Sequence, residues 1–291
     1  MSRHSGKPPI SKEKLRARKS LSQNFLVDST IADKIVEAVP FKPGDVVYEI
    51  GSGKGFITER FVQRGAVVWA IEKDRRMVGM LRKKFGRDRN VSIHHADILD
   101  LPVQSEPPAG AWLVGNLPFG IGTPILQWIF DHRKTLRGAV VTLQREVVNR
   151  LLAPPKDSDR SALSVWFQAR GRGQRIVNIP PKAFVPPPRV TSTVMRIEFV
   201  PETPGVEGVP GIEYIVRSAF AQKRKVIANN LRLLTHLTPE DWTRLHNECG
   251  DLLRRRAEEL HADDFIRLAK VLRLADRFGH DRDTGGDNLS G

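Results

Sequence analysis

The fold is decided by the stretch from Val46 to Gly55, which reads VVYEIGSGKG. An apolar β-branched run passes directly into glycines at every second position, and a helical pattern follows. This order of strand, glycine turn and helix lets a small ligand touch the backbone at the carboxyl end of a parallel sheet. The spacing is G-x-G-x-G. Phe56 stands where the dinucleotide fingerprint G-x-G-x-x-G has its last glycine, and no P-loop pattern is present.

Two acidic residues follow the next strand candidates in the chain. Glu72 ends the run that begins at Ala66, at the place where a carboxylate accepts hydrogen bonds from ribose hydroxyls. Asp97 and Ile98 follow the third strand candidate, where the acid can accept from an adenine amino group while the isoleucine covers the ring. Together and in this order, these residues predict a site for a nucleoside with a non-phosphate tail.

The fourth strand candidate ends in Asn116-Leu117-Pro118-Phe119. The exocyclic amine of adenine is a poor nucleophile because its lone pair is delocalised into the ring. The side-chain oxygen of Asn116 and the carbonyl of Leu117 can accept from that amine and hold it in line with a methyl donor. Pro118 stiffens the loop, and Phe119 offers a face for stacking of an extruded base. Behind the glycine loop and the two acids, this motif indicates amino-group methylation.

Short apolar runs alternate with amphipathic stretches up to Phe199, which favours an α/β fold with a mostly parallel sheet. The last two strand candidates have no long helix between them, so we expect an antiparallel pair at one edge. The predicted strands are Asp45–Ile50, Ala66–Ile71, Val91–His94, Ala111–Val114, Ala139–Leu143, Arg175–Ile179 and Thr193–Phe199.

The composition changes after residue 200. Residues 201–211 read PETPGVEGVPG and predict a linker, and only helical patterns follow. Thr238 and Pro239 form an N-cap followed by proline at the first helical position. Residues 1–20 form a basic arm and residues 279–291 a polar tail, both expected to be flexible. The predicted helices are Ile212–Leu234, Pro239–Glu248, Leu252–Leu260 and Ala262–Phe278.

The charge is strongly positive and unevenly distributed. The chain has 47 Lys and Arg against 33 Asp and Glu, a net charge of +14. Residues 1–200 carry 33 basic and 18 acidic side chains, whereas residues 201–291 carry 14 and 15. A field of this sign attracts polyanions, nucleic acid first. The apolar runs are too short to span a membrane, and one cysteine, Cys249, permits no internal disulfide. Neither a secretory signal nor a metal site is expected.

The sequence resembles the KsgA-type small-subunit rRNA adenine N6-dimethyltransferases, which are relatives of the Erm macrolide-resistance methylases. The likeness covers roughly residues 20–275. Its last three blocks resemble the KsgA pattern and not the Erm pattern. The matching blocks are SQNFL at 22–26, EIGSGKG at 49–55, Glu72, Asp97, NLPF at 116–119, TPIL at 123–126, LQREV at 143–147, AFVPPPRV at 183–190, FAQKRK at 220–225 with NNL at 229–231, RAEEL at 256–260 and DF at 264–265.

The resemblance implies a Rossmann-like S-adenosylmethionine-dependent methyltransferase domain at 21–200 and a smaller all-helical C-terminal domain at 212–278. It implies two dimethylated, adjacent adenosines in the 3′-terminal hairpin of 16S-type rRNA, S-adenosylhomocysteine as product, and a monomeric cytoplasmic protein that binds the small ribosomal subunit. The implied cofactor-binding residues are Gln23, Asn24, Leu26, Glu49, Gly51, Gly53, Glu72, Lys73, Asp97, Ile98 and Asn116. Those implied for the target base are Asn116, Leu117, Pro118 and Phe119, with Phe184 as a second stacking wall, and for RNA phosphates Lys223, Arg224 and Lys225 at the start of a helix.

Three departures from the family pattern stand out. Phe119 replaces the usual tyrosine, which keeps the stacking face but removes a hydroxyl. Gly120-Ile121-Gly122 replaces a more polar stretch, and Thr191 stands where the family usually has Asp. We expect these changes to affect the rate and the order of the loop more than the type of reaction.

Three other functions remain open at this point. An Erm-type methylase would modify large-subunit rRNA and confer macrolide resistance, but the helical blocks argue against it. A non-catalytic RNA-binding assembly or transcription factor can use the same fold. A methyltransferase for small molecules fits poorly with the positive charge of residues 1–200.

Overall fold

A computed structural model describes residues 23–101, 106–118, 120–201, 210–234 and 237–272. The expected basic arm at 1–20, the tail at 279–291, most of the 201–211 linker and Phe119 lie outside the described residues. No helix in the described ranges combines the length and the apolar character that crossing a membrane requires.

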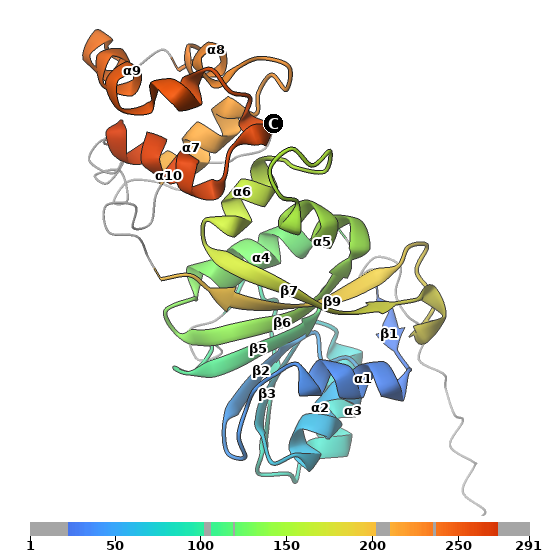
Figure 1. The fold of residues 1–291 in the computed structure, drawn as a ribbon. Helices are drawn as coiled ribbons and strands as arrows, with labels where there is room; N and C mark the ends of the chain where they lie inside the picture. Colours follow the sequence, from blue (N-terminus) through green and yellow to red (C-terminus); the bar gives the residue numbers. More distant parts are fainter. Residues whose placement is uncertain (1–22, 102–105, 119, 202–209, 235–236, 273–291) are drawn as a thin grey trace, which may run out of the picture.

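The centre of the molecule is a seven-stranded sheet in the order β4-β3-β2-β5-β6-β9-β7 (Figure 1). The five strands from β4 to β6 are parallel, while β9 is antiparallel to both β6 and β7. The prediction of a mostly parallel sheet with an antiparallel pair at one edge is therefore confirmed. The strands are β2 (Val46–Ile50), β3 (Val67–Glu72), β4 (Val91–His95), β5 (Ala111–Asn116), β6 (Leu136–Gln144), β7 (Gly171–Ile179) and β9 (Ser192–Phe199).

Helices cover both faces of the sheet because apolar side chains point alternately to its two sides. On β2, Val47 belongs to the core cluster under α1 and α2, whereas Tyr48 and Ile50 belong to the cluster under α4 and α5. The helices of this region are α1 (Ser29–Glu37), α2 (Phe56–Gln63), α3 (Arg75–Phe85), α4 (Gly122–Asp131), α5 (Arg145–Leu152) and α6 (Ala162–Gln168).

A second, two-stranded sheet joins distant parts of the chain. Its strands β1 (Phe25–Leu26) and β8 (Phe184–Val185) are antiparallel, with Phe25 opposite Val185. The N–H of Val27 also donates to the carbonyl of Ala183 at 2.9 Å. This pairing holds the segment at residues 23–27 beside the sheet (Figure 1).

The C-terminal part is helical, as predicted, and has its own hydrophobic cluster, which packs against α6 through Val165. Thr238 caps α9 as expected: its hydroxyl accepts from the N–H of Asp241 at 3.2 Å, and Pro239 is the first helical residue. How the chain divides into domains remains a prediction. The helices are α7 (Pro210–Ala219), α8 (Ile227–Leu231), α9 (Pro239–Leu253) and α10 (Ala262–Val271), with a 3₁₀ turn at Ala257–Glu259.

Two predicted helices were wrong. The expected helix Ile212–Leu234 is broken between α7 and α8, because the buried Asn230 side chain donates to the carbonyls of Ala219 and Gln222 and stabilises the turn between them. The expected helix Leu252–Leu260 does not form either. Leu252 and Leu253 end α9, and the following chain turns into the 3₁₀ segment.

Candidate active site

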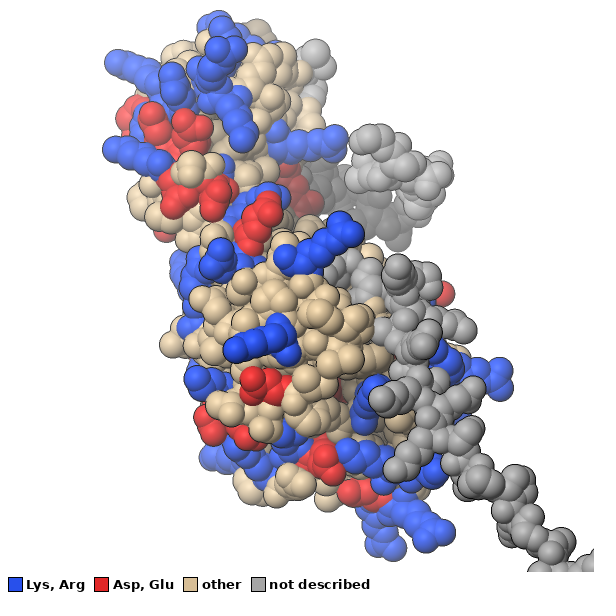
Figure 2. All heavy atoms as spheres, turned by 90° about the vertical axis from the view of Figure 1, so that its right-hand side faces the viewer, with Lys and Arg blue, Asp and Glu red and all other residues tan. Residues whose placement is uncertain are grey.

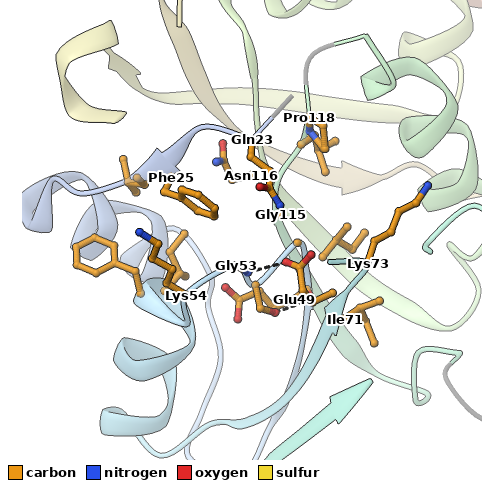
Figure 3. Close-up of a pocket in the computed structure, with 18 of the residues that line it drawn as sticks. Gln23, Phe25, Glu49, Gly53, Lys54, Ile71, Lys73, Gly115, Asn116 and Pro118 are labelled. Atoms are coloured by element: carbon orange, nitrogen blue, oxygen red, sulfur yellow. Dashed lines mark hydrogen bonds between the residues drawn. The ribbon is translucent and has the colours of Figure 1, made fainter. Parts of the chain in front are cut away.

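A cavity of about 550 Å³ opens at the carboxyl ends of β2, β3 and β5. It brings together the predicted cofactor residues, which come from the segment before α1, the glycine loop and the carboxyl ends of β2, β3, β4 and β5 (Figure 3). The predicted residues that line it are Gln23, Asn24, Leu26, Glu49, Gly51, Gly53, Glu72, Lys73, Asp97, Ile98, Asn116, Leu117 and Pro118.

The glycine loop can approach a ligand closely because its glycines have left-handed backbone. Gly53 has φ +54°, and a Cβ there would lie 3.2 Å from the ring of Phe25. Gly55 has φ +72°, and a Cβ there would lie 2.5 Å from the ring of Phe85. A side chain at Gly55 would therefore collide with the ring of Phe85, one at Gly53 would press on the ring of Phe25, and either would strain the left-handed backbone.

Glu72 is fixed by two backbone amides at the end of β3. Its Oε2 accepts from the N–H of Gly53 at 2.8 Å, and its Oε1 accepts from the N–H of Asp74 at 2.7 Å. Burial nevertheless raises the pKa of this carboxyl above its ordinary value, against the lowering effect of the two amides. Each carboxylate oxygen keeps further acceptor capacity, so the group is oriented and can still bind hydroxyls.

Glu49 lies beside Glu72 and is 3 % exposed. Its Oε2 accepts from the hydroxyl of Thr58. Burial raises the pKa of Glu49 to about 7, and the negative charge of Glu72 adds to this shift, while hydrogen bonds from Thr58 and Ser52 oppose it. The cavity thus contains two buried carboxyl groups in its wall, which favours a ligand with positive charge.

One end of the cavity is formed by Lys73, Asp97 and Ile98. The Nζ of Lys73 forms an ion pair with Oδ2 of Asp97, and the N–H of Leu99 donates to Oδ1 at 3.2 Å. Ile98 is buried below this pair. Asp97 and Ile98 therefore both line the cavity, as expected for a carboxylate that accepts from the adenine amino group and an apolar side chain that covers the ring.

Asn116 is the last residue of β5 and points into the cavity (Figure 3). Its Nδ2 donates to the backbone carbonyl of Asn24 at 3.0 Å, which leaves the side-chain oxygen as the acceptor of that amide. The N–H of Leu117 donates to the carbonyl of Thr142 at 3.1 Å and ties the following loop to β6. The segment before α1 therefore orients Asn116.

Sequence reasoning missed several residues that build the cavity. Asp74 is 4 % exposed and accepts from Nε2 of Gln23 at 3.0 Å, which links the N-terminal segment to Glu72. Its hydrogen bonds with Arg76 lower the pKa of Asp74 to about 2. Its place as an N-cap before α3 was a usable signal. Phe25, Lys54 and Val185 line the cavity itself, whereas Asp74 supports it through its hydrogen bonds with Gln23 and Glu72.

Two predicted placements differ from the structure. Phe184 is 2 % exposed and packs in the core cluster under α1, while its neighbour Val185 is 54 % exposed and lines the cavity. The alternation of side chains along β8 puts the aromatic ring inside, so a stacking role for Phe184 stays a prediction that this conformation does not support. Lys223, Arg224 and Lys225 do not begin a helix but lie exposed in the turn between α7 and α8.

The comparisons with known proteins agree on one family. The family model described as "Ribosomal RNA adenine dimethylase" matches residues 14–273. The "Ribosomal RNA small subunit methyltransferase A" of Pseudomonas savastanoi pv. phaseolicola is 36% identical over 262 residues, which cover 88% of this chain and 95% of the relative. The protein of the same name from Acidobacterium capsulatum is 37% identical over 273 residues, which cover 91% and 96%.

Solved structures support the fold. A dimethyladenosine transferase from Plasmodium falciparum aligns with a TM-score of 0.75 at 24% identity, over 84% of this chain and 95% of that one. The 23S rRNA methyltransferase ErmE aligns with a TM-score of 0.66 at 24% identity, over 86% and 99%. At these identities the likeness concerns the fold, which is the Rossmann-like methyltransferase fold that the family resemblance implied. Because the family model spans the whole described region, the chain belongs to the ribosomal RNA adenine dimethylase family.

Proposed function

We propose that this rRNA adenine dimethyltransferase converts two adjacent adenosines in the 3′-terminal hairpin of small-subunit rRNA to N6,N6-dimethyladenosine, and thereby acts in small-subunit assembly. The observation that carries the proposal is Asn116 at the cavity wall, oriented by the carbonyl of Asn24 and followed by Leu117 and Pro118. The names of the curated relatives favour the small subunit as the target.

The cavity fits S-adenosylmethionine, which supplies an electrophilic methyl group on a sulfonium when bound. A volume of about 550 Å³ lies in the range of about 300–1,000 Å³ that is usual for ligand sites. We infer that Glu72 binds the ribose and that Asp97 and Ile98 hold the adenine. Gln23, Asn24, Leu26, Gly51 and Gly53 would enclose the methionyl end. The buried carboxyl groups of Glu49 and Glu72 complement the positive charge of the cofactor. The product is S-adenosylhomocysteine, and the reaction needs no metal.

The residues of this chain act by positioning. The side-chain oxygen of Asn116 and the carbonyl of Leu117 accept from the target amine and hold its nitrogen in line with the methyl donor. They also stabilise the positive charge that develops on this nitrogen, which is the transition-state interaction that accelerates transfer. No strong base is required, because the amine becomes acidic once methylated and water takes its proton. Phe119 stacks on the base in this proposal.

The target adenosine leaves its stack to enter the cavity, at a cost of a few kcal/mol that is smallest in a loop. Exposed cations supply the compensating attraction to phosphates. Figure 2 shows Lys and Arg side chains over both the sheet region and the helical part on one side of the molecule. We propose that Lys223, Arg224 and Lys225, exposed in their turn, are among those that bind RNA.

We also propose that the protein is a cytoplasmic monomer, with a methyltransferase domain at 21–200, a linker at 201–211 and a helical domain at 212–278. The Erm-type alternative has less support, because the curated relatives carry the small-subunit name while ErmE matches at the level of the fold. A non-catalytic assembly factor is the remaining alternative, which the experiment below separates.

The test is to incubate the protein with tritiated S-adenosylmethionine and undermethylated small subunits, and separately with large subunits, and then to map the labelled adenosines. We expect label on two neighbouring adenosines near the 3′ end of the small-subunit rRNA. Label confined to the large subunit would move the protein to the resistance class. Cofactor binding without label on either subunit would leave the non-catalytic role as the better account.

A further inference from the structure

Lys54 occupies the second variable position of the glycine loop and lines the cavity next to Phe25. Its Nζ lies 4.8 Å from the centroid of the Phe25 ring. Three lysines line the cavity, and two of them are paired: Lys73 with Asp97 and Lys84 with Glu59. Lys54 has no carboxylate partner among the residues that the structure describes. It is therefore a cation whose charge is available to a ligand.

The hydrogen bonds and ion pairs of the cavity show the order in which its residues lie from one end to the other. Glu72 lies in the middle, because it accepts from the N–H of Gly53 on one side and precedes Lys73 on the other. Lys73 belongs to the Asp97 end through its ion pair. Lys54 follows Gly53 and lies at the opposite end, beside the segment that carries Phe25 (Figure 3). With ribose at Glu72 and adenine at Asp97, the remaining part of the cofactor extends toward Lys54.

At the Lys54 end of the cavity, a cation is needed to bind the carboxylate of the methionyl tail. When ionised, the buried carboxyl groups of Glu49 and Glu72 attract a sulfonium and an ammonium group, but they repel the carboxylate that the methionyl tail also carries. The ring of Phe25 packs on Gly53 and supports the Lys54 ammonium through its face. The ammonium is thus held at the edge of the cavity before any ligand arrives.

We propose that Lys54 binds the α-carboxylate of the methionyl tail and so selects a cofactor that carries an intact amino-acid group. The proposal rests on the proposed function, since it requires S-adenosylmethionine in this cavity. It assigns Lys54 a role that neither Lys73 nor Lys84 can fill, because their charges are already paired.

Two ligands separate this contact from general effects on the cavity. S-adenosylhomocysteine carries the carboxylate, and 5′-methylthioadenosine shares the adenosine and the sulfur but lacks the amino-acid group. Calorimetric titration of full-length Lys54→Met should show a Kd for S-adenosylhomocysteine raised about three- to fivefold, which is the upper part of the range for an exposed ion pair. The Kd for 5′-methylthioadenosine should change less than about twofold. Lys54→Arg should recover most of the affinity.

Lys84→Met is the matched control, because it removes the same charge from the same cavity but from a lysine paired with Glu59. Equal losses for both ligands, or equal losses in Lys54→Met and Lys84→Met, would overturn the proposal. So would an unchanged Kd for S-adenosylhomocysteine together with a raised KM for RNA, because the cation would then serve a phosphate. Failure of the unaltered protein to bind S-adenosylhomocysteine would instead refute the proposed function itself, and Lys54 with it.

Discussion

The sheet region and the helical part bury polar groups in different ways. At the carboxyl ends of β2 and β3, the buried polar side chains lie around the cavity and include two carboxyl groups with raised pKa. In the helical part, Asn230 and Asp241 are buried; Asn230 donates to backbone at the end of α7, and Asp241 accepts from the backbone N–H of Thr238 at the start of its own helix. Burying a polar group is costly in both places. The buried polar groups of the sheet region lie in the wall of a cavity, as the proposed cofactor site requires, whereas those of the helical part stabilise the turns and ends of helices.

The largest effect is expected for Asn116→Ala, which removes an acceptor from the developing positive charge. We expect kcat for methyl transfer to undermethylated small subunits to fall about 10²- to 10³-fold, as for loss of one transition-state hydrogen bond. The thermal midpoint and the Kd for S-adenosylhomocysteine should change little by comparison. An unchanged kcat would show that Asn116 does not contribute to methyl transfer. It would also count against a functional role for the polar side chains at the cavity.

Glu49 should make stability depend on pH. Its pKa in the folded protein is about 7, against 4.5 for the free group, so the folded state binds the proton more tightly than the unfolded state. The free energy of unfolding should therefore fall by about 3 kcal/mol as pH rises from about 4.5 to about 7, and then level off. Glu49→Gln keeps an acceptor for Thr58 and should lack this component. Identical slopes in urea titrations of both proteins would contradict the assignment.

Asn230→Ala should destabilise the helical part without touching the cofactor. The substitution leaves the carbonyls of Ala219 and Gln222 without their side-chain donor, at a cost of about 2 kcal/mol in the free energy of unfolding. Its neighbour Asn229 is exposed, so Asn229→Ala is the control and should be nearly neutral. The Kd for S-adenosylhomocysteine should stay unchanged in both variants. A raised Kd in Asn230→Ala would show that the two regions are coupled.

The smallest effect is expected for Glu72→Gln. The oxygen of the new side-chain amide can still accept from one of the two backbone N–H groups and from a ribose hydroxyl. The substitution removes the negative charge, and the NH2 group, itself a donor, is placed against the other backbone N–H. We expect the Kd for S-adenosylhomocysteine to rise about tenfold, near the low end for hydrogen bonds to charged groups. Glu146→Gln, on the exposed face of α5, is the control and should leave the Kd unchanged. A Kd within twofold of the original would exclude Glu72 as the ribose ligand.

Much of the cavity could be predicted because its parts are local. A strand, a glycine turn and an acid at the next strand end are short patterns, and a parallel sheet brings all of its carboxyl ends to one edge. Glu72, Asp97 and Asn116 therefore came from the sequence alone. Their hydrogen-bond partners did not, because Gly53, Lys73 and Asn24 meet them only through tertiary packing.

The differences from the predictions have physical causes of the same kind. The stacking role of Phe184 stays a prediction; its side chain lies in the core where β8 pairs with β1, and nothing near residue 184 in the sequence specifies that partner. The break between α7 and α8 depends on Asn230 in α8, whose side chain donates to the carbonyls of Ala219 and Gln222 earlier in the chain. A continuous amphipathic pattern across Ile212–Leu234 hides this break, since the apolar residues on both sides enter one core.

The pairing of β1 with β8 also has a consequence for biosynthesis. The segment at 23–27 is among the first described residues to leave the ribosome, yet its strand partner at 184–185 is synthesised only after the parallel sheet is complete. The carbonyl of Asn24 that orients Asn116 is therefore held in place late. A nascent chain can therefore form the five parallel strands of its sheet before β1 can pair with β8 beside the cavity.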